Sequence, residues 1–335
     1  MSKDSFDQGR RQIIGSVGVG LAGALAATNA VAQTAGKASE KGAALEDPTK
    51  KYPRPPFKAQ SQPWPGLVSK MNPRPDHGET SYRGSGRLKG RKALITGGDS
   101  GMGRAAAIAY AREGADVAIN YLPAEEPDAK EVLDLIKAEG RVGIGIPGDL
   151  RDETFCRHLI DEAVKGLGGL DILVNNAGRQ QTHESILEIT TEQFDWTMKT
   201  NVYAPFWLTK AALPHLRPGS AIIATTSVVA ADPLPDLYDY SQTKAATTNY
   251  VRCLAKQLGP KGIRVNGVAP GPIWTALQVS GGATQEKLKN FGGDTPLGRP
   301  GQPVELASVY VQLAAADASY ATGQIYGVAG GRGQP

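Results

Sequence analysis

Short apolar runs alternate with longer amphipathic segments throughout residues 86–335. The runs have the length of β-strands, and the segments between them have the length of helices. This alternation predicts an α/β domain in which one doubly wound parallel sheet of seven strands is covered on both faces by helices. The expected strands are Lys92–Thr96, Asp116–Tyr121, Val142–Pro147, Asp171–Asn175, Ala221–Thr226, Arg264–Ala269 and Gln324–Val328. Because ligands bind such sheets beyond the carboxyl ends of the strands, functional residues should follow these runs directly.

Residues 1–32 do not share this pattern. Arg10 and Arg11 precede an uncharged, weakly apolar stretch over 12–32 that ends in the small-residue sequence Ala-Val-Ala. Paired arginines, an apolar stretch and a cleavage-type end predict a twin-arginine export signal, and hence a periplasmic protein. Two alternatives stay open: an uncleaved membrane anchor, or a chance pattern in a cytoplasmic protein. Interruption by Gly, Thr and Asn argues against stable insertion in a membrane.

Residues 33–85 form a proline-rich arm whose composition excludes regular helix. Its prolines are Pro48, Pro53, Pro55, Pro56, Pro63, Pro65, Pro73 and Pro75. A flexible linker is one interpretation. Large aromatic residues are interleaved, however, and pure linkers seldom carry them: Tyr52, Phe57, Trp64 and Tyr82. We therefore expect the arm to pack, either on its own domain or on a neighbouring subunit.

Composition and charge narrow the possible functions. The chain has 335 residues, of which 40% are hydrophobic and 21% charged, with a formal net charge of +4. These values exclude a disordered or collagen-like chain. The small net charge and the lack of a basic run argue against nucleic-acid binding. Cys156 and Cys253 could form at most one bridge, and His77 has no second histidine at ligand spacing, so no metal site is expected.

A glycine-rich turn follows the first expected strand and precedes an alanine-rich helix. The turn reads Thr96-Gly97-Gly98-Asp99-Ser100-Gly101-Met102-Gly103, in which Gly97 allows a tight turn and Gly101 leaves room for a pyrophosphate. Gly103 lets the helix pack closely on the strand, and the helix N-terminus faces the anion. A glycine turn in this context predicts a Rossmann domain that binds a dinucleotide.

The residues after the next strands extend the expected cofactor groove. The second strand ends at Asn120 and Tyr121, where an acid would accept bonds from a ribose 2′-OH. Asn120 therefore leaves NAD and NADP open, with NADP slightly favoured, and Arg104 is the nearest candidate for a 2′-phosphate. Further expected contacts come from Asp149 and Leu150, on the adenine, and from Asn176, Ala177 and Gly178, near the ribose.

A catalytic group is expected beyond the fifth strand. Ser227 follows that strand, and Tyr240 and Lys244 share one face of a helix predicted over 238–258. A tyrosine is too weak an acid–base at its ordinary pKa, but a nearby ammonium favours its phenolate. Tyr238 lacks such a partner, because Gln242 stands four residues on.

These motifs resemble those of the short-chain dehydrogenases/reductases over residues 86–335, and the arm resembles the N-terminally extended subgroup that includes the YghA-type and general-stress-type oxidoreductases. The resemblance implies that Ser227, Tyr240 and Lys244 act with Asn201, which in the family holds a proton-relay water. It implies that Pro270, Gly271, Ile273 and Thr275 cover the nicotinamide, with Tyr240 and Lys244 also contacting the cofactor. It also implies a homotetramer.

The leading hypothesis is an NAD(P)-dependent oxidoreductase that acts on a small alcohol, aldehyde, ketone or sugar. Two alternatives use the same fold: a non-catalytic dinucleotide sensor or scaffold, and a non-redox reaction such as epimerisation. Residues 276–302 are expected to form a mobile lid with glycine hinges. His183 lies near the expected pocket and is either a substrate contact or an ordinary loop residue.

The export signal yields a direct prediction. Replacing Arg10 and Arg11 together by lysine should retain the protein in the cytoplasm, because the signal depends on the paired arginines. Fractionation followed by immunoblotting measures the distribution. Unimpaired export of the double variant would argue against this route.

Overall fold

The computed structural model describes residues 45–333, so the expected export signal and the first part of the arm lie outside the described residues. The described residues from Asp47 onward form one compact unit. Its centre is an all-parallel sheet of seven strands in the order β3-β2-β1-β4-β5-β6-β7. From β1 the chain adds β2 and β3 on one side and β4 to β7 on the other. Such a switch in strand order, here between β1 and β4, creates the crevice in which parallel sheets bind ligands.

The strands confirm the expected fold, with ends that differ by one residue in places. They are β1 (Lys92–Thr96), β2 (Asp116–Tyr121), β3 (Gly143–Pro147), β4 (Ile172–Asn175), β5 (Ala221–Thr225), β6 (Arg264–Pro270) and β7 (Ile325–Val328). β6 continues to Pro270 because this residue still pairs with Val328 across the sheet, and the N–H of the next residue, Gly271, donates to the carbonyl of Val328 at 3.0 Å.

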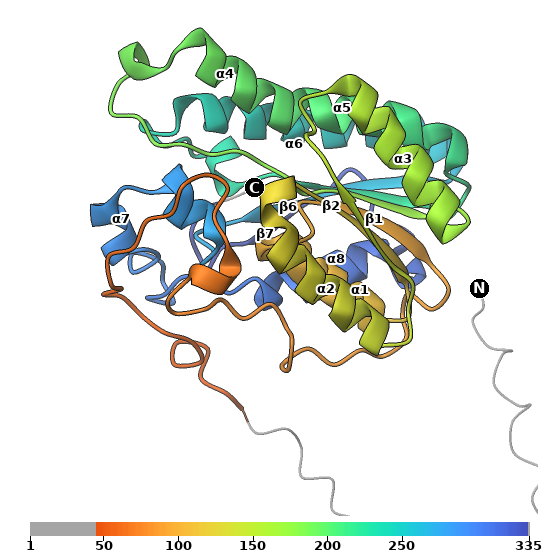
Figure 1. The fold of residues 1–335 in the computed structure, drawn as a ribbon, viewed down its shortest axis with the longest axis horizontal. Helices are drawn as coiled ribbons and strands as arrows, with labels where there is room; N and C mark the ends of the chain where they lie inside the picture. Colours follow the sequence, from red (N-terminus) through yellow and green to blue (C-terminus); the bar gives the residue numbers. More distant parts are fainter. Residues whose placement is uncertain (1–44, 334–335) are drawn as a thin grey trace, which may run out of the picture. The chain divides into compact units, whose positions relative to one another are not determined.

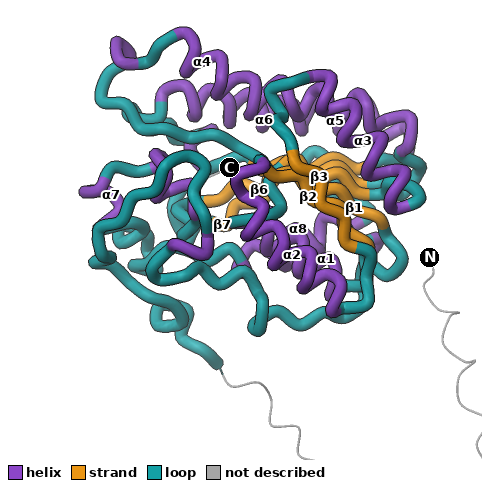
Figure 2. The backbone as a smooth tube through the Cα atoms, in the orientation of Figure 1, coloured by secondary structure: helices purple, strands orange, loops and turns teal. Residues whose placement is uncertain are grey.

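Helices cover both faces of the sheet, as Figures 1 and 2 show. One layer holds α1 (Gly101–Arg112), α2 (Glu126–Ala138) and α8 (Val304–Ala314); the other holds α3 (Glu153–Leu167), α5 (Ala204–Ala212) and α6 (Tyr238–Leu258). Two shorter helices are α4 (Thr191–Met198) and α7 (Gln285–Lys289). Alternate residues of β1 contribute to the hydrophobic cores on opposite faces of the sheet. Ala93 and Ile95 pack under α1, whereas Leu94 packs under α3.

Part of the arm packs on the same chain through an aromatic cluster. Phe57 stacks on Trp274 with ring centroids 4.3 Å apart. The indole N–H of Trp274 donates to the carbonyl of Pro73 at 2.8 Å. Val68 and Met71 complete a small buried core with these rings. The described arm therefore contributes apolar area to the domain, as its aromatic residues led us to expect.

A second anchor consists of polar contacts between the arm and α1. Arg112 donates to the carbonyls of Gly78, Glu79 and Tyr82 at 2.5–2.8 Å. The hydroxyl of Tyr82 donates to Glu113 at 2.6 Å. These bonds satisfy backbone carbonyls of an irregular segment that forms no helix or sheet ladder. The arm can therefore remain irregular and still pack against the domain.

His77 belongs to this anchor. It is fully buried, and its Nδ1 lies 3.1 Å from Glu79, while burial holds its pKa below the ordinary range. Within the described residues, no three side chains of metal-ligating type come together.

The segment expected to act as a lid contacts the arm. The N–H of Phe57 donates to the carbonyl of Lys289 at 2.8 Å, and that of Gln62 donates to Val279 at 2.9 Å. Gly281 and Gly292 have φ values of +114° and +72°, which suit glycine alone. Movement of this segment stays a prediction.

Replacing Phe57 by alanine should lower the free energy of unfolding by about 3 kcal/mol, since the change removes a stacked ring from a small core. Denaturant unfolding measures the loss. Tyr320→Ala is the control, because that ring is fully exposed. Equal stability of the Phe57 variant and the wild type would contradict a packed arm.

Candidate active site

The buried face of α6 carries the expected tyrosine and lysine. Tyr240 and Lys244 lie one helical turn apart and are 8% and 4% exposed. Ser227 follows β5 and begins a short 3-10 turn, where its hydroxyl accepts the N–H of Val229 at 3.3 Å. Tyr238, two residues before Tyr240 on the same helix, is exposed. The structure thus brings the three expected residues together and leaves Tyr238 outside.

The amine of Lys244 is held inside the protein. It donates to the carbonyl of Thr225 at 2.7 Å and lies 5.4 Å from the centre of the Tyr240 ring. Burial disfavours the ammonium and lowers its pKa to about 8. Lys244 is therefore a cation beside the phenol, with a pKa only slightly above neutral pH.

Burial also raises the pKa of Tyr240, to about 12, while a hydrogen bond with Ser227 lowers it in part. Without further charge nearby, the phenol stays protonated at neutral pH. A cationic nicotinamide ring, together with the Lys244 ammonium, would favour the phenolate. The pocket therefore makes the acidity of Tyr240 depend on what binds beside it.

Asn201 lies in a π-helical turn, Lys199–Tyr203, between α4 and α5. Its amide donates to the carbonyl of Arg179 at 2.9 Å and to Thr243 at 3.0 Å, and its oxygen accepts the N–H of Arg179 at 2.8 Å. A side chain at Gly178 would lie 3.6 Å from both Asn201 and Lys244. Asn201 is thus fixed near the lysine, and π-turns of this kind recur at functional sites.

The glycine turn has the shape that a pyrophosphate requires. Gly97 and Gly101 have φ values of +60° and +51°. A Cβ at Gly103 would lie 2.0 Å from the carbonyl of Gly97, so only glycine permits this approach of α1 to β1. The N-terminus of α1 is left facing the crevice, where its free N–H groups can bind an anion. These observations fit a dinucleotide.

A groove of about 270 Å³ runs from this turn to Tyr240. The expected cofactor residues that line it are Gly97, Asp99, Ser100, Gly101, Met102, Asn120, Tyr121, Asp149, Leu150, Asn176, Ala177, Gly178, Tyr240, Lys244 and Thr275. Gly103 lies behind the turn and acts through packing. Asn176 contributes mainly to the turn itself, because its amide donates to the carbonyls of Thr96 and Gly97 at 3.1 Å.

Two expected contacts have other partners. Arg104, the candidate for a 2′-phosphate, is buried and pairs with Glu79 at 3.0 Å and Glu131 at 2.8 Å, so it holds the arm to α2. Asp149 accepts bonds from Arg151, whose guanidinium lies 2.5 Å away. An adenine amino group would have to share that carboxylate.

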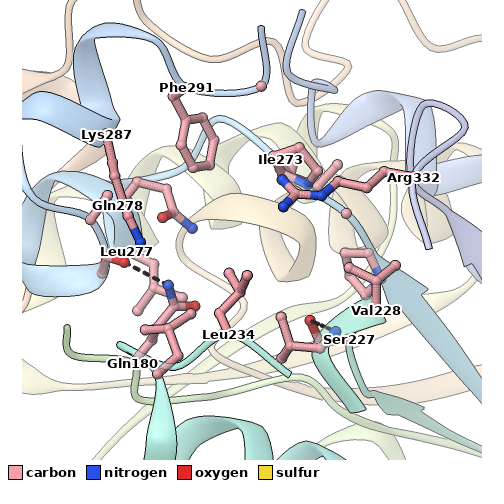
Figure 3. A pocket seen from close by; sticks show the side chains of 18 of the residues that line it. Gln180, Ser227, Val228, Leu234, Ile273, Leu277, Gln278, Lys287, Phe291 and Arg332 are labelled. Carbon is pink, nitrogen blue, oxygen red and sulfur yellow. Dashed lines mark hydrogen bonds between the residues drawn. The ribbon is translucent and has the colours of Figure 1, made fainter. Parts of the chain in front are cut away.

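A second cavity of about 800 Å³ meets the groove at Tyr240 and at Met102 and Thr275. Ser227 lines this cavity, as do Pro270, Gly271 and Ile273, which were expected on the cofactor. Figure 3 shows the side chains of Gln180, Leu234, Gln278 and Phe291 around the space. His183 is not among the lining residues, although its neighbour Thr182 is.

Sequence reasoning missed the part of the arm that lines both cavities. Pro55 and Pro56 line the larger one, and Trp64, Pro65 and Gly66 line the groove. The signal was present in the interleaved aromatic residues, but the sequence does not state which surface they cover.

Arg179 links the arm to the groove wall. Its guanidinium lies 5.2 Å from the centre of the Trp64 ring and 3.8 Å from that of Trp196. Arg151 lies 4.2 Å from the Trp196 ring, so cations and rings alternate along one wall. Desolvation lowers the pKa of Arg179.

Comparison with known proteins decides the family. A family model described as "Enoyl-(Acyl carrier protein) reductase" matches residues 97–332. The chain belongs to the short-chain dehydrogenase/reductase family. Among curated relatives, it is 58% identical to "Uncharacterized oxidoreductase YghA" of Escherichia coli, over 86% of this chain and 98% of that protein. The family identification predicted from the motifs is therefore confirmed, and the chain is an oxidoreductase of this family.

The similarity also covers relatives from another bacterium and from a plant. The chain is 51% identical to "General stress protein 39" of Bacillus subtilis, over 84% of this chain and 97% of that protein. It is 44% identical to "NADPH-dependent aldehyde reductase 1, chloroplastic" of Arabidopsis thaliana, over 80% of this chain and 94% of that protein.

A solved short-chain dehydrogenase from Burkholderia cenocepacia, in complex with NADP, superimposes with a TM-score of 0.68. It is 34% identical, and the match covers 73% of this chain and 98% of that chain. The similarity supports a nicotinamide dinucleotide as the class of cofactor.

Removal of the phenol tests the role of Tyr240. Tyr240→Phe should reduce turnover by about 10²–10⁴-fold, because the proton donor is lost, while the cofactor Kd stays within experimental error. Steady-state kinetics and calorimetry measure the two effects, and Tyr238→Phe serves as the control. Near-normal turnover in the Tyr240 variant would contradict the assignment.

Burial of the Lys244 ammonium should appear in the pH dependence of stability. The folded protein holds this pKa near 8, below the unfolded value of 10.5, so the cost of burying the charge is present below pH 8 and disappears by about pH 10.5. Relative to Lys244→Met, the unfolding free energy of the cofactor-free wild type should rise by about 3 kcal/mol across that window.

Denaturant unfolding at several pH values measures this difference, and Lys256→Met, a change of an exposed lysine on the same helix, is the control. A difference between wild type and Lys244→Met that is constant with pH would show that the amine is not buried as a cation.

Proposed function

We propose that the protein transfers a hydride between a nicotinamide cofactor and a small alcohol, aldehyde, ketone or sugar, with Tyr240 as general acid and base. The observation that carries this proposal is the position of Tyr240 where the dinucleotide groove meets the larger cavity. A residue that lines both spaces can reach a substrate oxygen while a nicotinamide lies beside the same carbon.

The bound cofactor supplies or accepts the hydride. In the direction of reduction, Tyr240 donates its phenolic proton to the substrate oxygen, and Ser227 hydrogen-bonds the same oxygen. Lys244 stabilises the resulting phenolate by its charge and can hold the ribose hydroxyls. Asn201 fixes the π-turn beside Lys244. A proton can return from solvent to Tyr240 through the amine of Lys244. In the direction of oxidation, each of these proton transfers is reversed.

The larger cavity favours a compact substrate with both apolar and polar parts. Its walls include Leu234, Phe291 and Ile273, whereas Gln278 has a buried amide oxygen that accepts no hydrogen bond from the described residues. An unsatisfied acceptor of this kind is suited to a substrate hydroxyl. The plant relative named as an aldehyde reductase supports a carbonyl substrate.

Assembly and location complete the proposal. A homotetramer built on the helices around Asn201 would cover Tyr203 and Phe206, which are 44% and 56% exposed. We also propose that the protein is exported through its twin-arginine signal, already loaded with cofactor. Among the described helices, none has the length and apolar character needed to cross a membrane.

A deuterium-transfer assay tests the function. Purified protein is incubated with 4-deuterated NADH or NADPH and a panel of aldehydes, ketones and sugars, and products are analysed by NMR. Transfer of deuterium to the substrate carbon is expected, with loss of transfer in Tyr240→Phe. Dinucleotide binding without transfer across the panel would favour a sensor, and product formation without net oxidation of cofactor would favour a non-redox reaction.

A further inference from the structure

A loop of the arm forms part of the wall of the cofactor groove. Phe57 stacks on the ring of Trp274, and the carbonyl of Pro73 accepts the indole N–H of the same side chain. The residues between them, 58–72, therefore form a loop whose two ends are held at one side chain. Residues 64–66, near the middle of this loop, line the groove.

The middle of the loop is a turn that is braced by its own first residue. The side-chain amide of Gln62 donates to the carbonyl of Leu67 at 3.0 Å, and its oxygen accepts the N–H of Leu67 at 2.8 Å. We refer to residues 62–67 as the flap. Because these two bonds lie within the flap, it can move as one piece without losing them.

The flap is held to the domain by few polar contacts. Among the described residues, one hydrogen bond joins it to the domain, from the N–H of Gln62 to the carbonyl of Val279 at 2.9 Å. The ring of Trp64 lies 5.2 Å from the guanidinium of Arg179. The indole N–H of Trp64 is buried and has no acceptor among the described residues. A segment with so few bonds to its surroundings can open at low free-energy cost.

The surroundings of the flap are held more firmly. Val68, directly after the flap, is fully buried, and its N–H donates to Asp128 on α2 at 2.6 Å. Ala276 and Val279, against which the flap lies, are buried in the same small core as Trp274. The opening motion that these contacts permit is therefore confined to the flap.

Gly66 shows how closely the flap fits the rim of the groove. A Cβ at this position would lie 2.8 Å from the carbonyl oxygen of Ala276 and 3.1 Å from the Cβ of Ser280, which also lines the groove. Such a distance to a backbone oxygen is too short for a side chain, so glycine is what allows this close approach. A methyl group here would hold the flap away from the rim.

The arm spans the crevice at the point where the strand order switches. Trp64 contacts Arg179, which follows β4, whereas Val68 is bonded to Asp128 on α2, which follows β2. Strands β4 and β2 lie on opposite sides of β1, and the glycine turn over 97–103 follows β1 itself. A dinucleotide bound at this turn therefore lies in a groove that the flap closes on one side.

We propose that the flap closes over the bound dinucleotide, with Trp64 as its contact residue, and that the dinucleotide enters and leaves only when the flap opens. This inference rests on the proposed function and assigns to the arm the control of cofactor exchange. Slow exchange of this kind would suit a protein that is exported already loaded with its cofactor.

Stopped-flow measurement of dinucleotide binding to the full-length protein tests the proposal without relying on turnover. NADPH and NADH are used in parallel, and the fluorescence of the nicotinamide reports binding and release. Gly66→Ala should raise both the association and the dissociation rate constants at least about tenfold, because the added methyl group holds the flap open. Gly259→Ala is the matched control, since its methyl group would meet open space.

A second variant removes the contact residue itself. Trp64→Ala should raise the dissociation rate constant at least about tenfold, because the ring that lines the groove is lost. Tyr320→Ala, which removes a fully exposed ring, is the control and should keep the wild-type rates.

Hydrogen exchange on the wild type gives an independent measurement. The amide hydrogens of residues 62–67 should exchange at least about tenfold more slowly in protein saturated with NADPH or NADH than in free protein. Residues 316–321, which do not line the groove, serve as the internal reference.

The outcomes separate the two proposals. Wild-type rate constants in both variants, or equal exchange of the flap in free and loaded protein, would overturn the inference and leave the proposed function standing. A rise of the dissociation rate alone in Gly66→Ala would indicate a contact without a gate and would also overturn it. If Gly66→Ala does not fold, Trp64→Ala and the wild-type exchange decide the matter. Binding of neither dinucleotide would overturn the proposed function as well.

Discussion

Lys244 keeps a charged amine inside the protein, within hydrogen-bonding distance of the carbonyl of Thr225. Burying a cation is costly unless nearby groups compensate it, and the lowered pKa records that cost. In the function that we propose, this cost is offset because the amine supplies a counter-charge to the phenolate of Tyr240. The helix register, the π-turn at Asn201 and the small residue at Gly178 all serve to bring this amine under the phenol without contact by bulky side chains.

Burial shifts the pKa of ionisable groups at both ends of the groove. At one end, the amine of Lys244 lies beside the phenol of Tyr240, which becomes an anion in the reaction that we propose. At the other end, Asp99 and Glu125 line the groove, and burial raises the pKa of these carboxyl groups to about 7 and about 8. Burial makes each of these groups sensitive to its neighbours, since low-dielectric surroundings strengthen the effect of any nearby charge.

Much of the sheet could be predicted from the sequence, because buried parallel strands read as short apolar runs and the glycine turn has strict spacing. The bounds of β1, β2 and α6 match the expected ranges residue for residue. The placement of Ser227, Tyr240 and Lys244 could also be predicted, because helical periodicity fixes which residues share a face.

The rest depended on contacts between distant parts of the chain. Arg104 is close in sequence to the glycine turn and was expected to contact a 2′-phosphate, but its guanidinium forms a salt bridge with Glu79 of the arm. The lining of the cavities by Pro55 and Trp64 likewise follows from packing of an irregular segment, which has no periodicity from which to read a facing surface.

The stacking of Phe57 on Trp274 has a consequence for the order in which the protein can be made. The arm leaves the ribosome early, whereas Trp274 and Arg299, whose guanidinium donates to the carbonyl of Pro48 at 2.8 Å, are synthesised more than 200 residues later. The arm must wait, without its partners, until nearly the whole chain has emerged. Closure of the two cavities is therefore among the last events of biosynthesis, and a nascent chain that stops before Trp274 has sheet strands but no completed site.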